Sequence, residues 1–252
     1  MFQIRQNLVK LQNLFVIHFV TSGFKSKRKG PFLVRCGSDY GGWWIPREIL
    51  KNTDSERLLI SAGLGFDVTF DEVLLNAGFE VIGLDPLLES VNYAKEQLSS
   101  YPKFTGLNMG LWKESGRSIF YAPRNESHDS WSTTNLQNTY LKDAKEFSVI
   151  SLVDLISRYP SIRSSDYTVL KMDIEGSEEV LIPIMMTLDE RFDLIEIEMD
   201  FLSLIPFFSF LRRFRAIAQA RKFLNMFESN KYLLIQVDHF NFIWQYQNDS
   251  TL

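Results

Sequence analysis

Two glycines and an acidic residue stand where a parallel sheet would bind a nucleoside. The apolar run Leu58–Ile60 leads into Gly63 and Gly65, and a second apolar run, Val81–Leu84, ends on Asp85. A helical pattern lies between the two runs. In an open parallel sheet, a unit of strand, glycine turn, helix, strand and acid holds the ribose of a nucleoside cofactor at the carboxyl ends of the strands. The stretch therefore predicts a cofactor site.

The glycine turn favours a cofactor that lacks a pyrophosphate. Nicotinamide and flavin sites use a third glycine, but Val68 stands at that position, and Asp67 at the predicted helix start would repel a phosphate. S-adenosylmethionine carries an ammonium instead and tolerates Asp67, although Asp67 could also cap the helix without any ligand. Asp85 can accept hydrogen bonds from both ribose hydroxyls. The predicted cofactor-binding residues are Ser61, Gly63, Gly65, Asp67, Asp85 and Trp112, of which Trp112 either flanks the adenine or belongs to the core.

The segments that would position these residues alternate between strand and helix. This alternation predicts βαβ units, and the last two apolar runs, Tyr232–Val237 and Phe240–Tyr246, predict an antiparallel hairpin. The predicted fold class is α/β, with a Rossmann-like, mostly parallel sheet and a C-terminal antiparallel hairpin. Helical patterns cover Asp67–Ala77, Glu89–Leu98 and Glu178–Met186, and strand patterns cover Glu80–Leu84, Phe104–Leu111, Tyr167–Gly176 and Phe192–Glu198.

Length and composition limit the class of protein. The 252 residues suit one large α/β domain with an extension, and a net charge of −4 gives no case for nucleic-acid binding. Cys36 is the single cysteine, which excludes an internal disulfide and is typical of a reducing compartment. We therefore expect a cytoplasmic protein.

The N-terminal segment is predicted to form an accessory helix. Ile4, Leu8, Leu11 and Phe15 fall at helical spacing and would make its apolar face. The apolar stretch is too short to span a bilayer, and a degenerate signal peptide is the alternative interpretation. A basic loop follows at Lys25–Lys29. Residues 1–30 are thus predicted to form an N-terminal helix and basic loop, and residues 31–252 the main domain.

Four segments of the chain resemble the FkbM-type S-adenosylmethionine-dependent methyltransferases, in the branch with a variant first motif. The resemblance implies that residues 31–252 form a class I methyltransferase domain. It also implies an acid two residues before the first glycine, where most class I methyltransferases hold the methionine ammonium, but Ser61 stands at that position. The four segments are Gly37–Trp43, Ser61–Asp71 together with Asp85-Pro86, Phe120–Pro123 followed by Ser127–Ser132, and Leu170–Glu178, whose sequence LKMDIEGSE is the most specific match.

The residues predicted to carry the chemistry follow the strand that contains the most specific match. Methyl transfer to an alcohol needs a nearby base, and Asp173 or Glu175 is predicted to serve. Lys171 lies one pleat before Asp173 on the same face and would help to bind the acceptor. The alternative interpretation is that Lys171 forms a structural ion pair with Glu178 or Glu198. Glu196, Glu198 and Asp200 could bind a divalent metal together with Asp173, but acids at a strand end are more often solvated or paired, so no metal is predicted.

A second amphipathic segment covers Phe201–Phe223. Within it, Phe207–Lys222 has one apolar helical face, which contains Phe214 and Ile217, and one basic face, which contains Arg212 and Arg215. One interpretation is a helix that packs on the sheet with its basic face outward. The other is peripheral contact with a membrane surface or with an anionic, lipid-linked acceptor.

Residues and resemblance together predict an S-adenosylmethionine-dependent methyltransferase. The nucleoside site follows from the residues, whereas the acceptor, a hydroxyl of a sugar, glycan or other small metabolite, follows from the resemblance. A non-catalytic interaction protein on a decayed methyltransferase fold is the first alternative, and Ser61 is its best support. An NAD-dependent oxidoreductase is the second, against which the missing third glycine argues.

Overall fold

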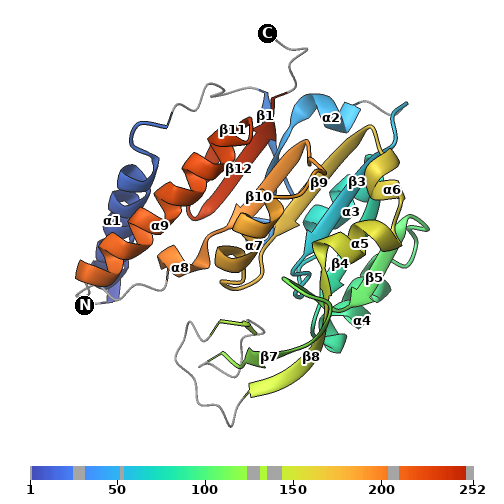
Figure 1. Cartoon of the computed structure of the whole chain (residues 1–252), viewed down its shortest axis with the longest axis horizontal. Coiled ribbons are helices and arrows are strands. Elements are labelled where there is room, and N and C mark those ends of the chain that lie inside the picture. Colours follow the sequence, from blue (N-terminus) through green and yellow to red (C-terminus); the bar gives the residue numbers. More distant parts are fainter. Residues whose placement is uncertain are drawn as a thin grey trace.

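The computed structural model describes residues 2–24, 32–51, 54–123, 131–134, 144–203 and 210–247. Within these ranges, helices cover both faces of a central sheet (Figure 1). The helices are α1 (Phe2–Thr21), α2 (Arg47–Lys51), α3 (Thr69–Asn76), α4 (Leu88–Gln97), α5 (Leu152–Arg158), α6 (Ser161–Ser164), α7 (Glu178–Met185), α8 (Asp200–Ser203) and α9 (Phe210–Ser229). The strands are β1 (Leu33–Cys36), β2 (Trp43–Pro46), β3 (Arg57–Ala62), β4 (Glu80–Asp85), β5 (Phe104–Asn108), β6 (Gly110–Trp112), β7 (Gly116–Tyr121), β8 (Ala144–Ser151), β9 (Tyr167–Met172), β10 (Leu194–Glu198), β11 (Tyr232–Asp238) and β12 (Asn241–Tyr246).

The central sheet has seven strands in the order β11-β12-β10-β9-β3-β4-β5. Neighbouring strands from β10 to β5 are parallel, whereas β12 runs antiparallel to both β10 and β11. This arrangement confirms the predicted fold class, a Rossmann-like class I methyltransferase sheet that is mostly parallel and ends in an antiparallel hairpin. The chain builds β4 and β5 on one side of β3 and then crosses to β9 on the other side. Ligands of open α/β sheets bind at such a reversal, outside the carboxyl ends of the strands.

Successive residues of the central strands enter two separate core layers. All six residues of β3 are buried, because both faces of the sheet are covered. Leu58 and Ile60 pack into the layer beneath α5, α7 and α9, whereas Leu59 packs with Phe70 of α3 and Val91 of α4. The two-residue period of a strand explains this division. The two layers hold the ends of β3, β4 and β9 in fixed positions.

The predicted strand Phe104–Leu111 is divided between two sheets. β5 ends at Asn108 in the central sheet, and β6 begins at Gly110 in a small sheet of order β6-β8-β7. The Asn108 side chain donates to the carbonyl oxygen of Pro86 over 2.8 Å, which fixes the chain where it leaves the central sheet. Residues 124–130 lie outside the described part, so the segment Ser127–Ser132 is described only from Trp131 onward.

The predicted N-terminal helix forms as α1, but its predicted apolar face is wrong at Leu11 and Phe15. The side chains of Ile4 and Leu8 lie outside the part that the structure describes. Val16 and Val20 are buried in the core, whereas Leu11 and Phe15 are exposed. The helix is apolar on nearly every side between Leu11 and Val20, so helical spacing alone could not select the face that packs. α1 lies against α9 (Figure 1). Arg221 of α9 donates to the carbonyl oxygen of Phe19 over 2.8 Å.

The predicted apolar face of the second amphipathic segment is also wrong in part. The helix α9 buries Ile217, Ala220 and Phe227, but it exposes Leu211 and also Phe214, which the interpretation as a helix packed on the sheet placed inward. α9 runs beyond the predicted segment to Ser229, and its packed face continues from Ile217 and Ala220 into this added part, where Phe227 is buried. Phe207 lies outside the described residues. Among the described residues, no helix combines the length and apolarity needed to cross a bilayer.

Candidate functional site

A cavity of about 600 Å³ opens at the carboxyl ends of the central strands. Of the predicted site residues, Ser61 is fully buried within β3 and Trp112 lines a separate small cavity with Leu152 and Met185, so neither lines the main one. Eight carboxylates line the main cavity, together with the two cationic side chains of Arg35 and Lys171. The predicted residues that the structure brings together there are Gly63, Gly65, Asp67, Asp85, Lys171, Asp173 and Glu175.

Gly63 allows the loop after β3 to touch the turn after β9. Its φ is +86°, and a β-carbon at this position would lie 1.8 Å from the carbonyl oxygen of Asp173. The Gly63 amide donates to the carbonyl oxygen of Leu84 over 2.9 Å, and the Asp173 amide donates to that of Ala62 over 3.0 Å. A side chain at position 63 would therefore force apart the two segments that form the floor of the cavity.

Asp85 binds the glycine loop directly. Its Oδ2 accepts the amides of Leu64 and Gly65 over 3.1 and 3.0 Å, and its Oδ1 accepts the amide of Leu87 over 2.8 Å. Amides that point out of a glycine loop are the groups that bind the pyrophosphate of a dinucleotide. Here the amides of Leu64 and Gly65 are directed at a carboxylate of the protein.

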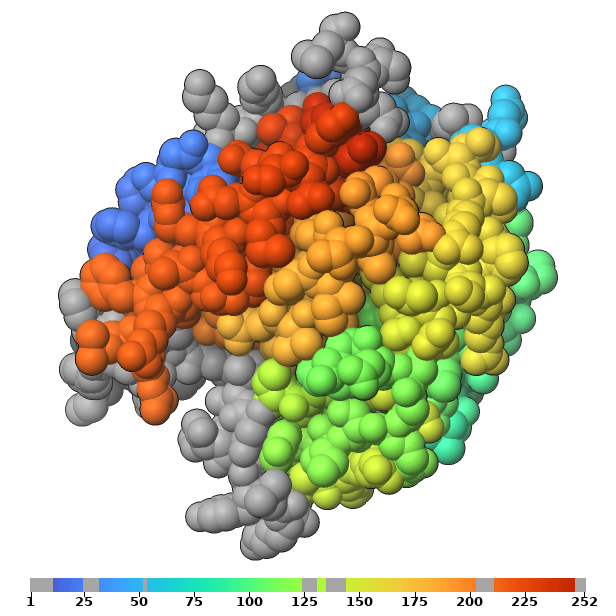
Figure 2. Space-filling model, in the orientation of Figure 1, coloured from blue at the N-terminus to red at the C-terminus, as the bar shows by residue number. Residues whose placement is uncertain are grey.

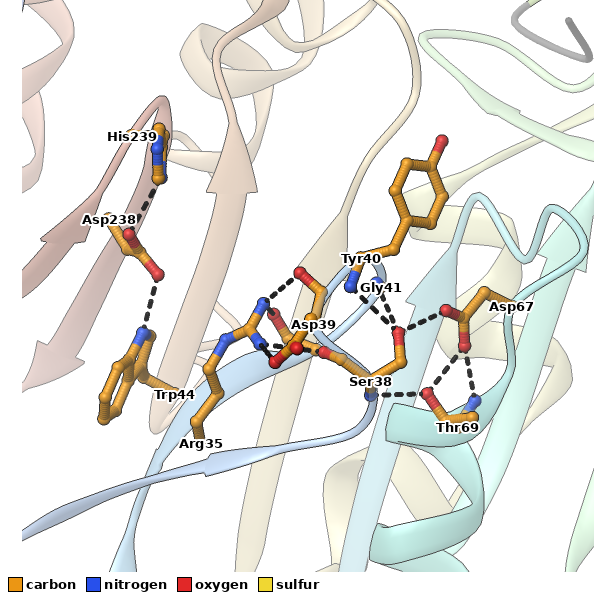
Figure 3. Close-up of polar contacts among 11 residues, drawn as sticks. Arg35, Ser38, Asp39, Tyr40, Gly41, Trp44, Asp67, Thr69, Asp238 and His239 are labelled. Atoms are coloured by element: carbon orange, nitrogen blue, oxygen red, sulfur yellow. Dashed lines mark hydrogen bonds and ion pairs between the residues drawn. The ribbon is translucent and has the colours of Figure 1, made fainter. Parts of the chain in front are cut away.

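Asp67 connects the glycine loop to the turn between β1 and β2 (Figure 3). It accepts the Ser38 hydroxyl over 2.5 Å and the Thr69 amide over 3.1 Å. Burial alone would raise the pKa of Asp67, but the hydrogen bonds from Ser38, Thr69 and Gly41 together lower it. A β-carbon on Gly41 would lie 2.8 Å from the Asp67 carboxyl carbon, so this contact requires a glycine.

Lys171 supports the glycine loop from within the sheet. Its Nζ donates to the carbonyl oxygen of Gly63 over 2.7 Å, and the side chain is buried. No ion pair joins it to Glu178 or Glu198 in the part of the chain that the structure describes. Burial raises the pKa of Glu196, its neighbour on β10, and the charge of Lys171 partly offsets that effect.

Four acidic residues gather on the β9–β10 side of the cavity: Asp173, Glu175, Glu198 and Asp200. Burial, followed by repulsion from Asp173 and Glu175, raises the pKa of Glu198 to about 8. Glu175 has a φ of +55°, which is rare for a residue with a side chain and is typical of functional turns. Among the described residues, no three His, Cys, Asp or Glu side chains are grouped to hold a metal ion.

The turn after β9 is also held from outside the central sheet. The Ser132 hydroxyl donates to the carbonyl oxygen of Glu175, and the hydroxyls of Thr133 and Ser177 lie 2.5 Å apart. Residues 131–134 thus close one side of the cavity, to which Trp131 contributes its side chain. These contacts join the third and fourth segments of the family resemblance in space.

Sequence reasoning missed the opposite wall of the cavity. Trp44 donates its indole N–H to Asp238 over 2.9 Å, and the other oxygen of Asp238 lies 3.0 Å from Nδ1 of His239 (Figure 3). Asp238 ends β11, and His239 follows it in the turn before β12. Because β11 runs in the same direction as β10, this turn lies at the carboxyl edge of the sheet. The predicted hairpin placed Asp238 and His239 at a turn, but the direction of β11, which brings that turn to the cavity, was not part of the prediction.

Comparisons with known proteins identify no family for the chain. No family model matches it, and neither does any curated protein sequence. Among solved structures, it is similar to a fibrillarin pre-rRNA processing protein of Methanococcus jannaschii, with 9% identity over 90% of this chain and 86% of the other, at a TM-score of 0.37. It is also similar to coclaurine N-methyltransferase bound to N-methylheliamine and SAH, with 9% identity over 79% of this chain and 51% of the other, at a TM-score of 0.29. The fold assignment rests on strand order and direction, not on these likenesses.

Replacing Gly63 by alanine should destabilise the protein far more than the same change at Gly23. Both glycines have φ near +90°, but a β-carbon at position 23 meets nothing within 4 Å. Gly23→Ala should therefore cost only the left-handed backbone strain, about 1–2 kcal/mol. Gly63→Ala adds the clash with Asp173 and should cost at least about 3 kcal/mol in total, or prevent folding. Urea unfolding measures both costs, and equal values would show that the Gly63 contact is unimportant.

Glu198→Gln should flatten the pH dependence of stability. The folded protein holds a proton on Glu198 up to a pKa of about 8, whereas the unfolded chain releases it near the ordinary value of 4.5. Stability from this group is thus complete at low pH and is lost as pH rises toward 8, by a few kcal/mol. The measurement is the unfolding free energy between pH 5 and pH 8.5. Glu114→Gln, at an exposed position, is the control. If Glu198→Gln lost as much stability as the natural protein over this pH range, the raised pKa of Glu198 would be contradicted.

Proposed function

We propose that the chain is an S-adenosylmethionine-dependent methyltransferase that acts on a hydroxyl group of a sugar, glycan or other small metabolite. The observation that carries this proposal is the double use of Asp85, which accepts the amides of Leu64 and Gly65 while it lines the cavity. The Asp85 carboxylate thus holds the glycine loop in place, and it stands where it could accept hydrogen bonds from the ribose of a nucleoside.

The residues of the cavity fit this cofactor and disfavour one with a pyrophosphate. Two loop amides that a pyrophosphate would need are engaged by Asp85, and the ionised members of the acidic lining would repel its negative charges. The same carboxylates favour a ligand that carries an ammonium and a sulfonium. Asp85 would hold the ribose hydroxyls. Asp67 or Asp173 would hold the ammonium, which accounts for the absence of an acid at Ser61, whose side chain does not reach the cavity.

When bound, S-adenosylmethionine supplies an electrophilic methyl group. The protein must then bind the acceptor, exclude water and remove the proton of its hydroxyl. Asp173 and Glu175 lie on the cavity wall, and one of them would take that proton. Lys171 would act as a positioning residue, because its ammonium fixes the carbonyl of Gly63 and with it the loop that holds the cofactor.

The resemblance to the FkbM-type methyltransferases supports oxygen as the acceptor atom. Its most specific segment, Leu170–Glu178, forms the end of β9, the turn at Glu175 with its positive φ and the start of α7. The same charge that suits the cofactor makes a nucleic acid a poor partner for this cavity, because its phosphates would meet a wall of carboxylates. A neutral, hydroxylated small molecule or glycan has no such penalty.

S-adenosylhomocysteine should raise the melting temperature of the protein, whereas NAD should not. Asp85→Ala should weaken S-adenosylhomocysteine binding by about 1–3 kcal/mol, because the ribose loses a charged partner and the loop loses its anchor. Asp193→Ala is a matched control, since Asp193 also accepts a backbone amide, that of Thr168 over 2.7 Å, but lies outside the cavity lining. Isothermal titration gives the affinities. Stabilisation by NAD alone would overturn the proposal, and stabilisation by neither ligand would favour a decayed, non-catalytic fold.

Asp173→Asn should remove turnover and spare cofactor binding. We expect a loss of at least about 100-fold in the release of S-adenosylhomocysteine across a panel of hydroxylated acceptors, which is typical for the loss of a general base. Asp166→Asn is the control, because Asp166 lies at the opposite end of β9 and accepts the amide of Glu56 over 2.9 Å. Full activity of Asp173→Asn would exclude Asp173 as the base and leave Glu175 as the candidate.

A further inference from the structure

We propose that the chain docks on anionic lipid surfaces through a face formed by α1 and the first half of α9. This basic–apolar face consists of Leu11, Leu14, Phe15 and Phe19 of α1 and Leu211 and Phe214 of α9, together with Arg212 and Arg215. The inference is independent of the proposed enzymatic activity, because none of these residues lines the cavity.

The apolar part of the face contains half of the large apolar side chains that are exposed in the described residues, six of twelve. Leu14 and Leu211 are exposed to 67% and 75%. The helices lie side by side at one end of the molecule, where the blue and orange surfaces meet (Figure 2). Exposed apolar side chains gathered on two neighbouring helices are typical of a site of interaction.

The packing of α1 and α9 leaves these side chains outward for a structural reason. Val16 and Val20 of α1 face the core, and Ile217 and Ala220 of α9 do the same. Arg221 then fixes the C-terminal end of α1 through the carbonyl oxygens of Phe19 and Ser22, each over 2.8 Å. The inward positions are thus filled by other residues, and the outward apolar side chains remain exposed.

The charge of the two segments identifies the partner. The helix α1, Phe2–Thr21, contains two lysines and arginines and no acid, and residues 210–219 of α9 contain three and no acid, in a chain whose net charge is −4. Arg212 and Arg215 are exposed and flank Phe214. Apolar side chains combined with lysine and arginine, without acids, are the composition of helices that lie in the interface of an anionic membrane. Each positive charge near an anionic leaflet contributes about fivefold to binding.

Other partners fit this face less well. Two copies joined through it would bring like charges together and gain no compensating acid. A nucleic acid would use the arginines but would leave the leucines and phenylalanines in water. The helices would lie on the bilayer and not across it, since no described helix meets the requirements of a membrane span.

The test is co-sedimentation of the full chain with vesicles. Vesicles of phosphatidylcholine with one third phosphatidylserine should bind the chain, and vesicles of phosphatidylcholine alone should bind it at least about tenfold more weakly. High salt should reduce the binding to the anionic vesicles. Equal binding to both kinds of vesicle, or binding to neither, would overturn the proposal.

Paired variants separate the charged from the apolar contribution. Arg212→Glu with Arg215→Glu should reduce binding by about tenfold or more, and Leu14→Gln with Leu211→Gln should also weaken it. The control for the charge variant is Lys51→Glu with Lys113→Glu, which changes two exposed cationic residues outside the face. The control for the apolar variant is Leu88→Gln with Val153→Gln, which changes two exposed aliphatic residues outside the face. These should leave binding unchanged, and melting temperatures identify the folded variants.

Two further outcomes would overturn the proposal. Controls that reduce binding as much as the test variants would show that binding is unspecific. The face would instead mediate contacts between copies if the natural chain formed a dimer and did not bind vesicles. In that case, Leu14→Gln with Leu211→Gln should dissociate the dimer. S-adenosylhomocysteine binding by each variant is a separate readout, so failure here and failure of the proposed activity can be distinguished.

Discussion

The close approach of two backbone segments at Gly63 determines the shape of the site. The carbonyl oxygen of Asp173 lies within 1.8 Å of the position that a β-carbon of residue 63 would take. The loop after β3 and the turn after β9 consequently form one continuous floor. Lys171 secures this floor from inside the sheet through the Gly63 carbonyl, and Asp85 secures the loop from the neighbouring strand. The proposed cofactor binding by the loop and the proposed proton removal by the turn both depend on this contact between Gly63 and Asp173.

Charge then decides what the site can accept. Eight acidic residues share one cavity with Arg35 and Lys171, and burial, followed by repulsion from Asp173 and Glu175, brings the pKa of Glu198 to about 8. A cationic ligand relieves this repulsion, whereas an anionic ligand increases it. The surface formed by α1 and the first half of α9 has the reverse character, since these two segments carry cations and no acids. The molecule is thus divided between an acidic cavity and a basic–apolar face.

Local sequence patterns predicted the parts of this structure that depend on local chemistry. The apolar strands, the glycine turn, Asp85 and the charged end of β9 are all readable because each is a short pattern with one physical meaning. Patterns could not show which side of an apolar helix packs, so the exposed positions of Phe15 and Phe214 were not foreseen. Nor could they show that Asp238 and His239 reach the cavity, because this follows from the direction of β11 in the sheet. The division of Phe104–Leu111 between two sheets has the same origin in tertiary pairing.

The central claim, that the glycine loop and Asp85 bind the nucleoside of S-adenosylmethionine, is tested most directly by a crystal structure with S-adenosylhomocysteine. The account predicts ligand density along Gly63–Gly65, with the ribose hydroxyls within hydrogen-bonding distance of the Asp85 carboxylate and the amino-acid end near Asp67 or Asp173. Density at any other place, or a crystal grown at saturating ligand with none in this cavity, would contradict it.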